Sequence, residues 1–159
     1  PDQVLKEWFR LLRTNGLVMF SCFGPDTLLE LKQAFAEVDA DPHSLPFVDM
    51  HDYGDMLVSA GFATPVMDVE RITLRYQTTA QLLADVRALG GLPLTDRRRS
   101  LMGKTAYQQL LRALERRRES DGRIPLSIEL VFGHAFKPQA TKLASGESII
   151  RLDFPKKRT

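Results

Sequence analysis

The segment Gly16-Leu-Val-Met-Phe-Ser-Cys-Phe-Gly-Pro-Asp-Thr-Leu-Leu-Glu-Leu31 decides the fold of this chain. Residues 17–20 form an unbroken apolar run that is followed by Ser21, Cys22 and Phe23. Such a run is typical of a strand covered on both faces, as in a parallel sheet with helices on each side. Gly24-Pro25 ends this strand, and Asp26 and Thr27 are predicted to cap the helix that follows. Ligands of open α/β sheets bind beyond the carboxyl ends of the strands, so the end of this strand is the first candidate site.

Hydrophobic periodicity predicts further strands and helices along the chain. Strands are expected over residues 66–76, with a bulge near Glu70-Arg71, and over residues 124–136. A short last strand is expected over residues 150–154. Asp49 and either Thr78 or Thr79 are predicted helix caps. Helices are expected over residues 28–38, 49–60, 79–89 and 103–119. The first helix is expected over residues 2–14, with a buried side made of Val4, Leu5, Trp8, Leu11 and Leu12.

Composition places the chain among single-domain globular proteins. It has 159 residues, of which 43% are hydrophobic and 26% charged. No run approaches the length of a membrane span, and no secretory signal opens the chain. A single cysteine excludes an internal disulfide and indicates a reducing compartment, so a cytoplasmic location is expected. The chain starts at Pro1 with an immediate helix, from which we expect a fragment or a processed product.

Positive charge is concentrated in the second half of the chain. Residues 97–123 hold nine Lys or Arg against three Asp or Glu, and residues 137–159 hold six against two. The densest cluster is Arg97, Arg98 and Arg99, followed by Lys104. Arginine forks bind carboxylate or phosphate groups, so the cluster favours an acidic partner, although a solvated surface loop explains it equally well. Nucleic acid is disfavoured, because no aromatic residues are interleaved with these cations.

Few residues have the spacing of a catalytic or metal site. Cys22 has no adjacent base or cation and is interpreted as a core residue. The spacings of His43, His51 and His134 match no metal motif. His51 lies in the first turn of a predicted helix, where it can either contact a ligand or remain solvated. No two glycines are separated by one residue, so the chain contains no glycine-rich loop for a dinucleotide or an adenosyl group.

Three segments of this chain resemble one enzyme family. Residues 12–28, with Phe-Gly-Pro-Asp-Thr-Leu, resemble the fifth-strand region of the malonyl-acyl-carrier-protein O-methyltransferases of biotin synthesis. Residues 47–68, with Met-His-Asp-Tyr-Gly-Asp, resemble the next helix and the start of strand six, and residues 123–136 resemble the last strand. A related branch contains arginine-modifying assembly factors of respiratory complex I, and these motifs fit that branch as well.

The resemblance implies the C-terminal half of a class I methyltransferase fold dependent on S-adenosylmethionine. Strands five to seven and their helices would occupy residues 1–138, and residues 139–159 would form an extension with a short edge strand and a basic tail. The resemblance also implies that the fifth strand pairs with strand four on one side and with the returning last strand on the other. The glycine-rich adenosyl loop of the family would precede Pro1, so no cofactor-binding residue is expected in this chain. The sequence departs from the family at Gly90-Gly91-Leu92-Pro93, where the family has a longer turn.

The implied reaction is methyl transfer to the free carboxylate of malonyl-acyl-carrier protein. This chain would supply the substrate side, with Ser21, Phe23 and His51 as candidate substrate-binding residues. Carrier proteins are strongly acidic, so the resemblance gives the cluster of residues 97–99 and Lys104 a role in carrier binding. The alternative is a noncatalytic module that binds an acidic protein. We expect the isolated chain to be inactive, to self-associate, and to bind neither metal, membrane nor S-adenosylmethionine.

Overall fold

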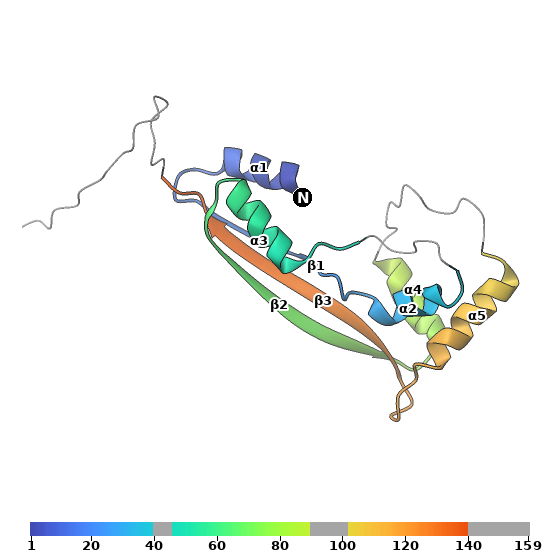
Figure 1. The fold of residues 1–159 in the computed structure, drawn as a ribbon. Helices are drawn as coiled ribbons and strands as arrows, with labels where there is room; N and C mark the ends of the chain where they lie inside the picture. Colours follow the sequence, from blue (N-terminus) through green and yellow to red (C-terminus); the bar gives the residue numbers. More distant parts are fainter. Residues whose placement is uncertain (40–45, 90–101, 140–159) are drawn as a thin grey trace, which may run out of the picture.

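The computed structural model describes residues 1–39, 46–89 and 102–139. Five helices and three strands lie in these ranges (Figure 1). No helix among them is long and apolar enough to cross a membrane. In chain order the elements are α1 (Asp2–Leu11), β1 (Leu17–Phe23), α2 (Leu29–Ala36), α3 (Met50–Ser59), β2 (Ala63–Tyr76), α4 (Thr79–Ala88), α5 (Lys104–Glu115) and β3 (Ile124–Phe136). The expected strand over residues 150–154 lies outside the described residues.

The three strands form one sheet in the order β1-β3-β2. β3 pairs antiparallel with both neighbours, from Leu17 opposite Phe136 to Phe23 opposite Leu130 on the β1 side. β1 and β2 therefore run in the same direction on either side of the last strand. This confirms the expected α/β architecture and the expected pairing of the first strand with the last one.

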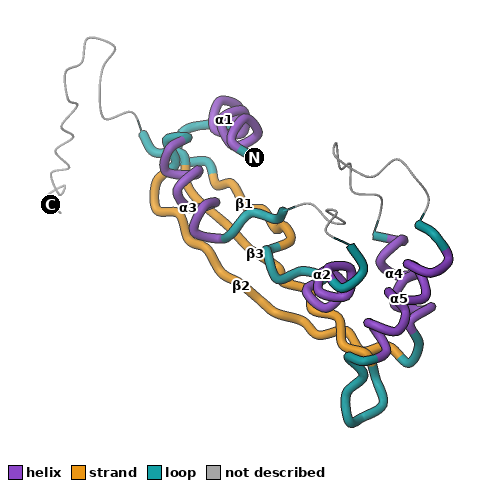
Figure 2. Tube along the Cα trace, turned by 45° about the vertical axis from the view of Figure 1, so that its right-hand side comes forward, coloured by secondary structure: helices purple, strands orange, loops and turns teal. Residues whose placement is uncertain are grey.

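α1 and α3 lie at one end of the sheet and α2, α4 and α5 at the other (Figure 2), and the strand register places the two groups on different faces. Residues directly opposite each other in antiparallel strands point to the same face, and successive residues point to opposite faces. α1 and α3 pack on the face of Val18 and Ala135 through a core that includes Leu5 and Leu57. The other core packs α2, α4 and α5 on the face of Tyr76, Ile124 and Leu126. Its members from these helices include Leu31, Leu82, Leu83, Leu110 and Leu114, and Leu28 joins it from just before α2.

One end of the second face is bare among the described residues. Leu17, Met19, Val66, Phe132 and Phe136 share that face through the strand register, and all five are exposed. Met19 is 71% exposed. The prediction that β1 is covered on both faces is thus wrong for the described structure, because its side chains alternate between a helix-covered face and an open one.

The first helix also differs from its prediction. α1 ends at Leu11, and the side that packs on the core is Leu5, Phe9 and Leu12, whereas Val4 and Leu11 are exposed. Periodicity alone predicted too many buried residues in this helix, because only the side of α1 that faces α3 and β1 is covered.

The irregularity in β2 lies earlier than expected. The register shifts between Ala63 and Val66, where Thr64 has a left-handed φ of 49°, and continues unbroken to Tyr76. The predicted bulge at Glu70-Arg71 is therefore wrong. β2 is an edge strand among the described residues, and it keeps its register from Val66 to Tyr76. Its apolar residues therefore stay on two different faces, and no bulge moves them to one face.

Two of the predicted helix caps are confirmed and one pair is wrong. Asp49 accepts a hydrogen bond from the His51 N–H at 2.8 Å, and Thr78 accepts one from Gln81 N–H at 3.2 Å. α2 instead begins at Leu29 with Leu28 at the cap position and no side-chain cap. The two predicted cap residues, Asp26 and Thr27, contact β3 instead.

Candidate functional site

The turn of residues 24–28, between β1 and α2, is bonded closely to β3. Gly24 N–H donates to the Glu129 carbonyl at 2.9 Å, and Leu28 N–H donates to the Ser127 carbonyl at 2.7 Å. The Thr27 hydroxyl donates to the same Glu129 carbonyl at 3.0 Å and accepts from Glu129 N–H at 3.1 Å. These bonds prolong the β1–β3 pairing past the end of the strand, so the turn is held as firmly as the sheet itself.

The Glu129 side chain fills the space under this turn. Glu129 is only 5% exposed, and its carboxylate Oε2 accepts a hydrogen bond from Asp26 N–H at 2.7 Å. A Cβ added to Gly24 would lie 2.8 Å from Glu129 Cγ, which makes glycine necessary at this close approach. Arg71 pairs with Asp26 at 2.7 Å and lies 3.7 Å from Glu129 Oε1, so the buried carboxylate has a cation as well as a backbone donor.

Strain is concentrated at the last residue of the turn. Leu28 has φ 61° and ψ 30°, a left-handed conformation that a branched side chain rarely adopts. Its side chain is buried, and the next turn of backbone is fixed by Glu30, which accepts from both the N–H and the hydroxyl of Ser127. The surrounding bonds therefore determine where α2 starts.

A cation and two aromatic rings lie beside the turn. Lys32 Nζ donates to the Pro25 carbonyl at 2.8 Å and lies 5.1 Å from the centre of the Phe47 ring. Phe47 packs edge-on against Phe23, the last residue of β1, at 5.8 Å between ring centres. Partial burial lowers the pKa of the Lys32 ammonium, while Asp26 and Glu129 favour its charged form. The end of β1 thus combines an apolar wall with fixed charges of both signs.

The opposite face of β1 carries a second group of aromatic residues. Phe20 lies 6.0 Å from Trp8 of α1 and 5.4 Å from Tyr53 of α3, measured between ring centres. Burial, with a smaller contribution from the Cys22 side chain, raises the pKa of Tyr53 to about 12. Cys22 is half-buried.

The structure brings two of the three predicted substrate-binding residues together. Ser21 and Phe23 point to the same face of β1; Ser21 is exposed and Phe23 half-buried. His51 lies on α3, which packs on the other face, and its ring is 78% exposed and bonded to Asp49 at 2.7 Å. Tyr53, rather than His51, is the α3 residue whose ring packs against β1. The role of His51 stays a prediction.

The predicted carrier-binding cluster is only partly described. Arg97, Arg98 and Arg99 lie outside the described residues. Lys104 is the first residue of α5 and is exposed. Their role in carrier binding remains a prediction.

Four residues at the site were not found from the sequence: Lys32, Phe47, Arg71 and Glu129. Glu129 had a detectable signal, since it is a charged residue inside the apolar strand Ile-Glu-Leu-Val-Phe. The other three lie in segments whose contact with the turn depends on tertiary folding.

Comparison with known proteins identifies the relatives of this chain. It is 51% identical over 154 residues to the malonyl-[acyl-carrier protein] O-methyltransferase of Laribacter hongkongensis, a match that covers 94% of this chain and 52% of the relative. The chain is homologous to the malonyl-[acyl-carrier protein] O-methyltransferases. The protein of that name from Gallionella capsiferriformans is 49% identical over 93% of the chain, and one from Coxiella burnetii is 44% identical over 93%.

The chain spans about half the length of these malonyl-[acyl-carrier protein] O-methyltransferase relatives. No protein-family model matches the chain. The resemblance inferred from residues 12–28, 47–68 and 123–136 is confirmed by these relatives.

Solved structures agree with the fold. A candidate methyltransferase from Bacillus halodurans C-125 matches 87% of this chain and 63% of its own with a TM-score of 0.52 at 14% identity. The YcgJ protein from Bacillus subtilis has the same TM-score over 87% of this chain and 58% of its own, at 10% identity. At these identities the likeness establishes the fold only, and it confirms the prediction of part of a class I methyltransferase sheet.

Proposed function

We propose that the protein containing this chain methylates the free carboxylate of malonyl-acyl-carrier protein in biotin synthesis, with S-adenosylmethionine as the methyl donor. The observation that carries the proposal is the 51% identity, over 94% of the chain, to a malonyl-[acyl-carrier protein] O-methyltransferase. The strand order β1-β3-β2 supports it, because it matches the pairing expected at the C-terminal side of such an enzyme.

The turn after β1 does not fit the methyl donor. It contains one glycine, and the Glu129 side chain fills the space beneath it. We therefore assign no described residue to S-adenosylmethionine.

In this proposal, the chain supplies the side of the active site that binds the substrate. A carboxylate is ionised at neutral pH, so the reaction needs no strong general base. What it needs is alignment of the carboxylate and exclusion of water. In the proposal Ser21 offers a hydroxyl donor, and Phe23 and Phe47 provide an apolar wall for the acyl chain. His51 is proposed to contact the substrate from α3, which packs on the other face of β1. The residues 97–99 and Lys104 contact the acidic carrier.

The test uses the complete gene product that includes these 159 residues. It is incubated with S-adenosylmethionine and malonyl-acyl-carrier protein, and the acyl group is examined by mass spectrometry for a methyl ester. Acetyl-acyl-carrier protein, which has no free carboxylate, is the control and should stay unmodified. Binding of the carrier without methyl transfer would instead favour the noncatalytic module.

The roles of the site residues are tested by substitution. Phe23→Ala should raise KM for the malonyl substrate, because it opens the wall at the end of β1. Replacing Arg97, Arg98 and Arg99 by Ala should weaken carrier binding more at low salt than at high salt, since salt screens an exposed attraction. Equal affinities at low salt would remove these arginines from the proposal.

A further inference from the structure

The side of α5 that faces away from the core carries two positive charges. Leu110 and Leu114 form its buried side. Lys104 and Arg112 are both exposed. Eight residues along a helix turn the side-chain direction by about 80°, so both lie on the half of α5 that faces away from the core but not directly above each other. Neither side chain forms an ion pair with another residue in the described part of the chain.

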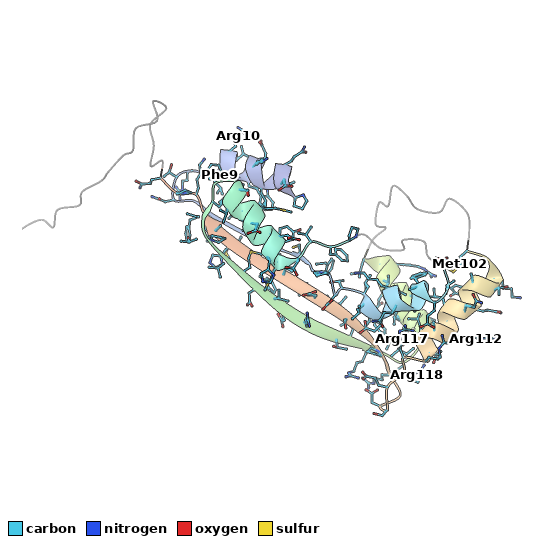
Figure 3. All side chains as sticks on the ribbon, in the orientation of Figure 1. Phe9, Arg10, Met102, Arg112, Arg117 and Arg118 are labelled. Atoms are coloured by element: carbon cyan, nitrogen blue, oxygen red, sulfur yellow. The ribbon has the colours of Figure 1, made fainter. Side chains whose placement is uncertain are left out.

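The neighbouring arginines are neutralised inside the protein. Glu37, next to the end of α2, accepts from Arg117 at 2.8 Å and pairs with Arg116 as well. The hydrogen bond from Arg117, followed by that from Arg116, lowers the pKa of Glu37. Arg118 pairs with Glu115 at 2.6 Å. Figure 3 labels Arg112, Arg117 and Arg118 on and next to α5. The run of arginines at residues 116–118 thus fastens elements of the chain together, whereas Arg112 has no ion-pair partner among the residues that the structure describes.

The same helix is packed against the candidate site. The core that buries Leu110 and Leu114 includes Leu28 of the turn after β1, and Phe23 packs against that core. A molecule bound on the exposed side of α5 would therefore lie outside this core, at the end of the sheet that carries α2, α4 and α5 (Figure 1).

We propose that Lys104 and Arg112 form a docking surface for the acidic face of the carrier protein. The inference rests on the proposed function and deepens it by naming which cations the partner contacts. Exposed charges of this kind direct encounter and set salt dependence, and two unpaired cations on one helix side complement a surface rich in carboxylates. Arg116 and Arg117 are not part of this surface, because both form ion pairs with Glu37.

The test compares two double charge reversals in the complete gene product. One variant is Lys104→Glu with Arg112→Glu. The matched control is Lys6→Glu with Arg13→Glu, two exposed cations on or just after α1 at the other end of the sheet, neither of which pairs with a described residue. Both variants change the net charge equally, so a difference between them reports a local contact. The probe is a fluorescently labelled malonyl-acyl-carrier protein, titrated at low and at high salt.

The α5 variant should bind the carrier about tenfold more weakly at low salt, which corresponds to about 1.4 kcal/mol, and the difference should shrink at high salt. The control should stay within about twofold of the unchanged protein. Unchanged binding by the α5 variant, or an equal loss in the control, would overturn the docking surface.

A second substrate separates this inference from the proposed function. Malonyl-pantetheine lacks the carrier protein, so the α5 variant should methylate it at the normal rate. If the unchanged protein methylates neither substrate, the proposed function fails. The carrier titration still decides the docking surface in that case.

Discussion

Thr27→Val removes the hydroxyl that joins the turn after β1 to β3. Thr27 is 1% exposed, and its hydroxyl donates to the Glu129 carbonyl and accepts from Glu129 N–H. Valine has nearly the same shape, so no cavity opens and the effect is confined to hydrogen bonding. The buried carbonyl and N–H of Glu129 would each lose their hydrogen bond to the Thr27 hydroxyl.

The magnitude follows from those two groups. A buried polar group without a partner costs about 1–3 kcal/mol. The Glu129 carbonyl keeps its bond from Gly24 N–H, so the N–H carries most of the cost, and the sum is about 2–3 kcal/mol. For a chain of this size that corresponds to a fall in Tm of roughly 4–12 °C.

The assay is thermal unfolding followed by circular dichroism, with two controls. Thr27→Ser keeps both hydrogen bonds and loses one methyl group, which costs about 0.8 kcal/mol. Thr73→Val alters an exposed residue of β2 and should stay within about 0.5 kcal/mol of the unchanged protein. If Thr27→Val is as stable as Thr27→Ser, the turn is not held by this hydroxyl and the reasoning is wrong.

Three further outcomes are expected from the same structure. Gly24→Ala should destabilise the protein and raise KM for the malonyl substrate, because its Cβ would lie 2.8 Å from Glu129 Cγ; unchanged kinetics and Tm would contradict that close approach. Met19→Glu, on the bare face of the sheet, should reduce self-association of the 159-residue chain in light scattering, whereas Lys6→Glu on α1 should not. Hydrogen bonds from His51 lower the pKa of Asp49 in the folded protein, so the stability they add is present above the ordinary aspartate pKa and is lost as the pH falls through the lowered folded value. Asp49→Ala should therefore destabilise the protein at neutral pH and have little effect in strong acid, and an equal effect at both pH values would refute the assignment.

The elements could be predicted where the local signal and the packing agree. Asp49 and Thr78 are caps by residue type and by structure, and β3 was predicted from the alternating apolar residues of its sequence. β1 could not be read in full, since its apolar run does not say which face is covered in the described structure. Sequence alone also could not show that Thr27 bonds to β3 instead of capping α2, because its partner is 102 residues away.

The candidate site was predicted only in its location. The end of the first strand followed from the α/β pattern, and Ser21 and Phe23 are there. Lys32 and Arg71 reach the turn from α2 and β2, and charged residues at such positions are ordinarily interpreted as solvated. Their contacts with the turn depend on how α2, β2 and the turn after β1 pack together, and a local sequence pattern does not contain that information.

The central position of β3 has a consequence for synthesis of the chain on the ribosome. Among the described residues β1 and β2 bond only to β3, and the partner of Leu17 is Phe136. A nascent chain that has emerged only as far as residue 123 therefore carries two strands with unpaired edges and an incomplete core. Pairings between such distant residues form slowly, and exposed strand edges favour aggregation. We expect ribosome-bound chains stopped before β3 to be protease-sensitive and to bind chaperones, and both properties to disappear once the last strand has emerged.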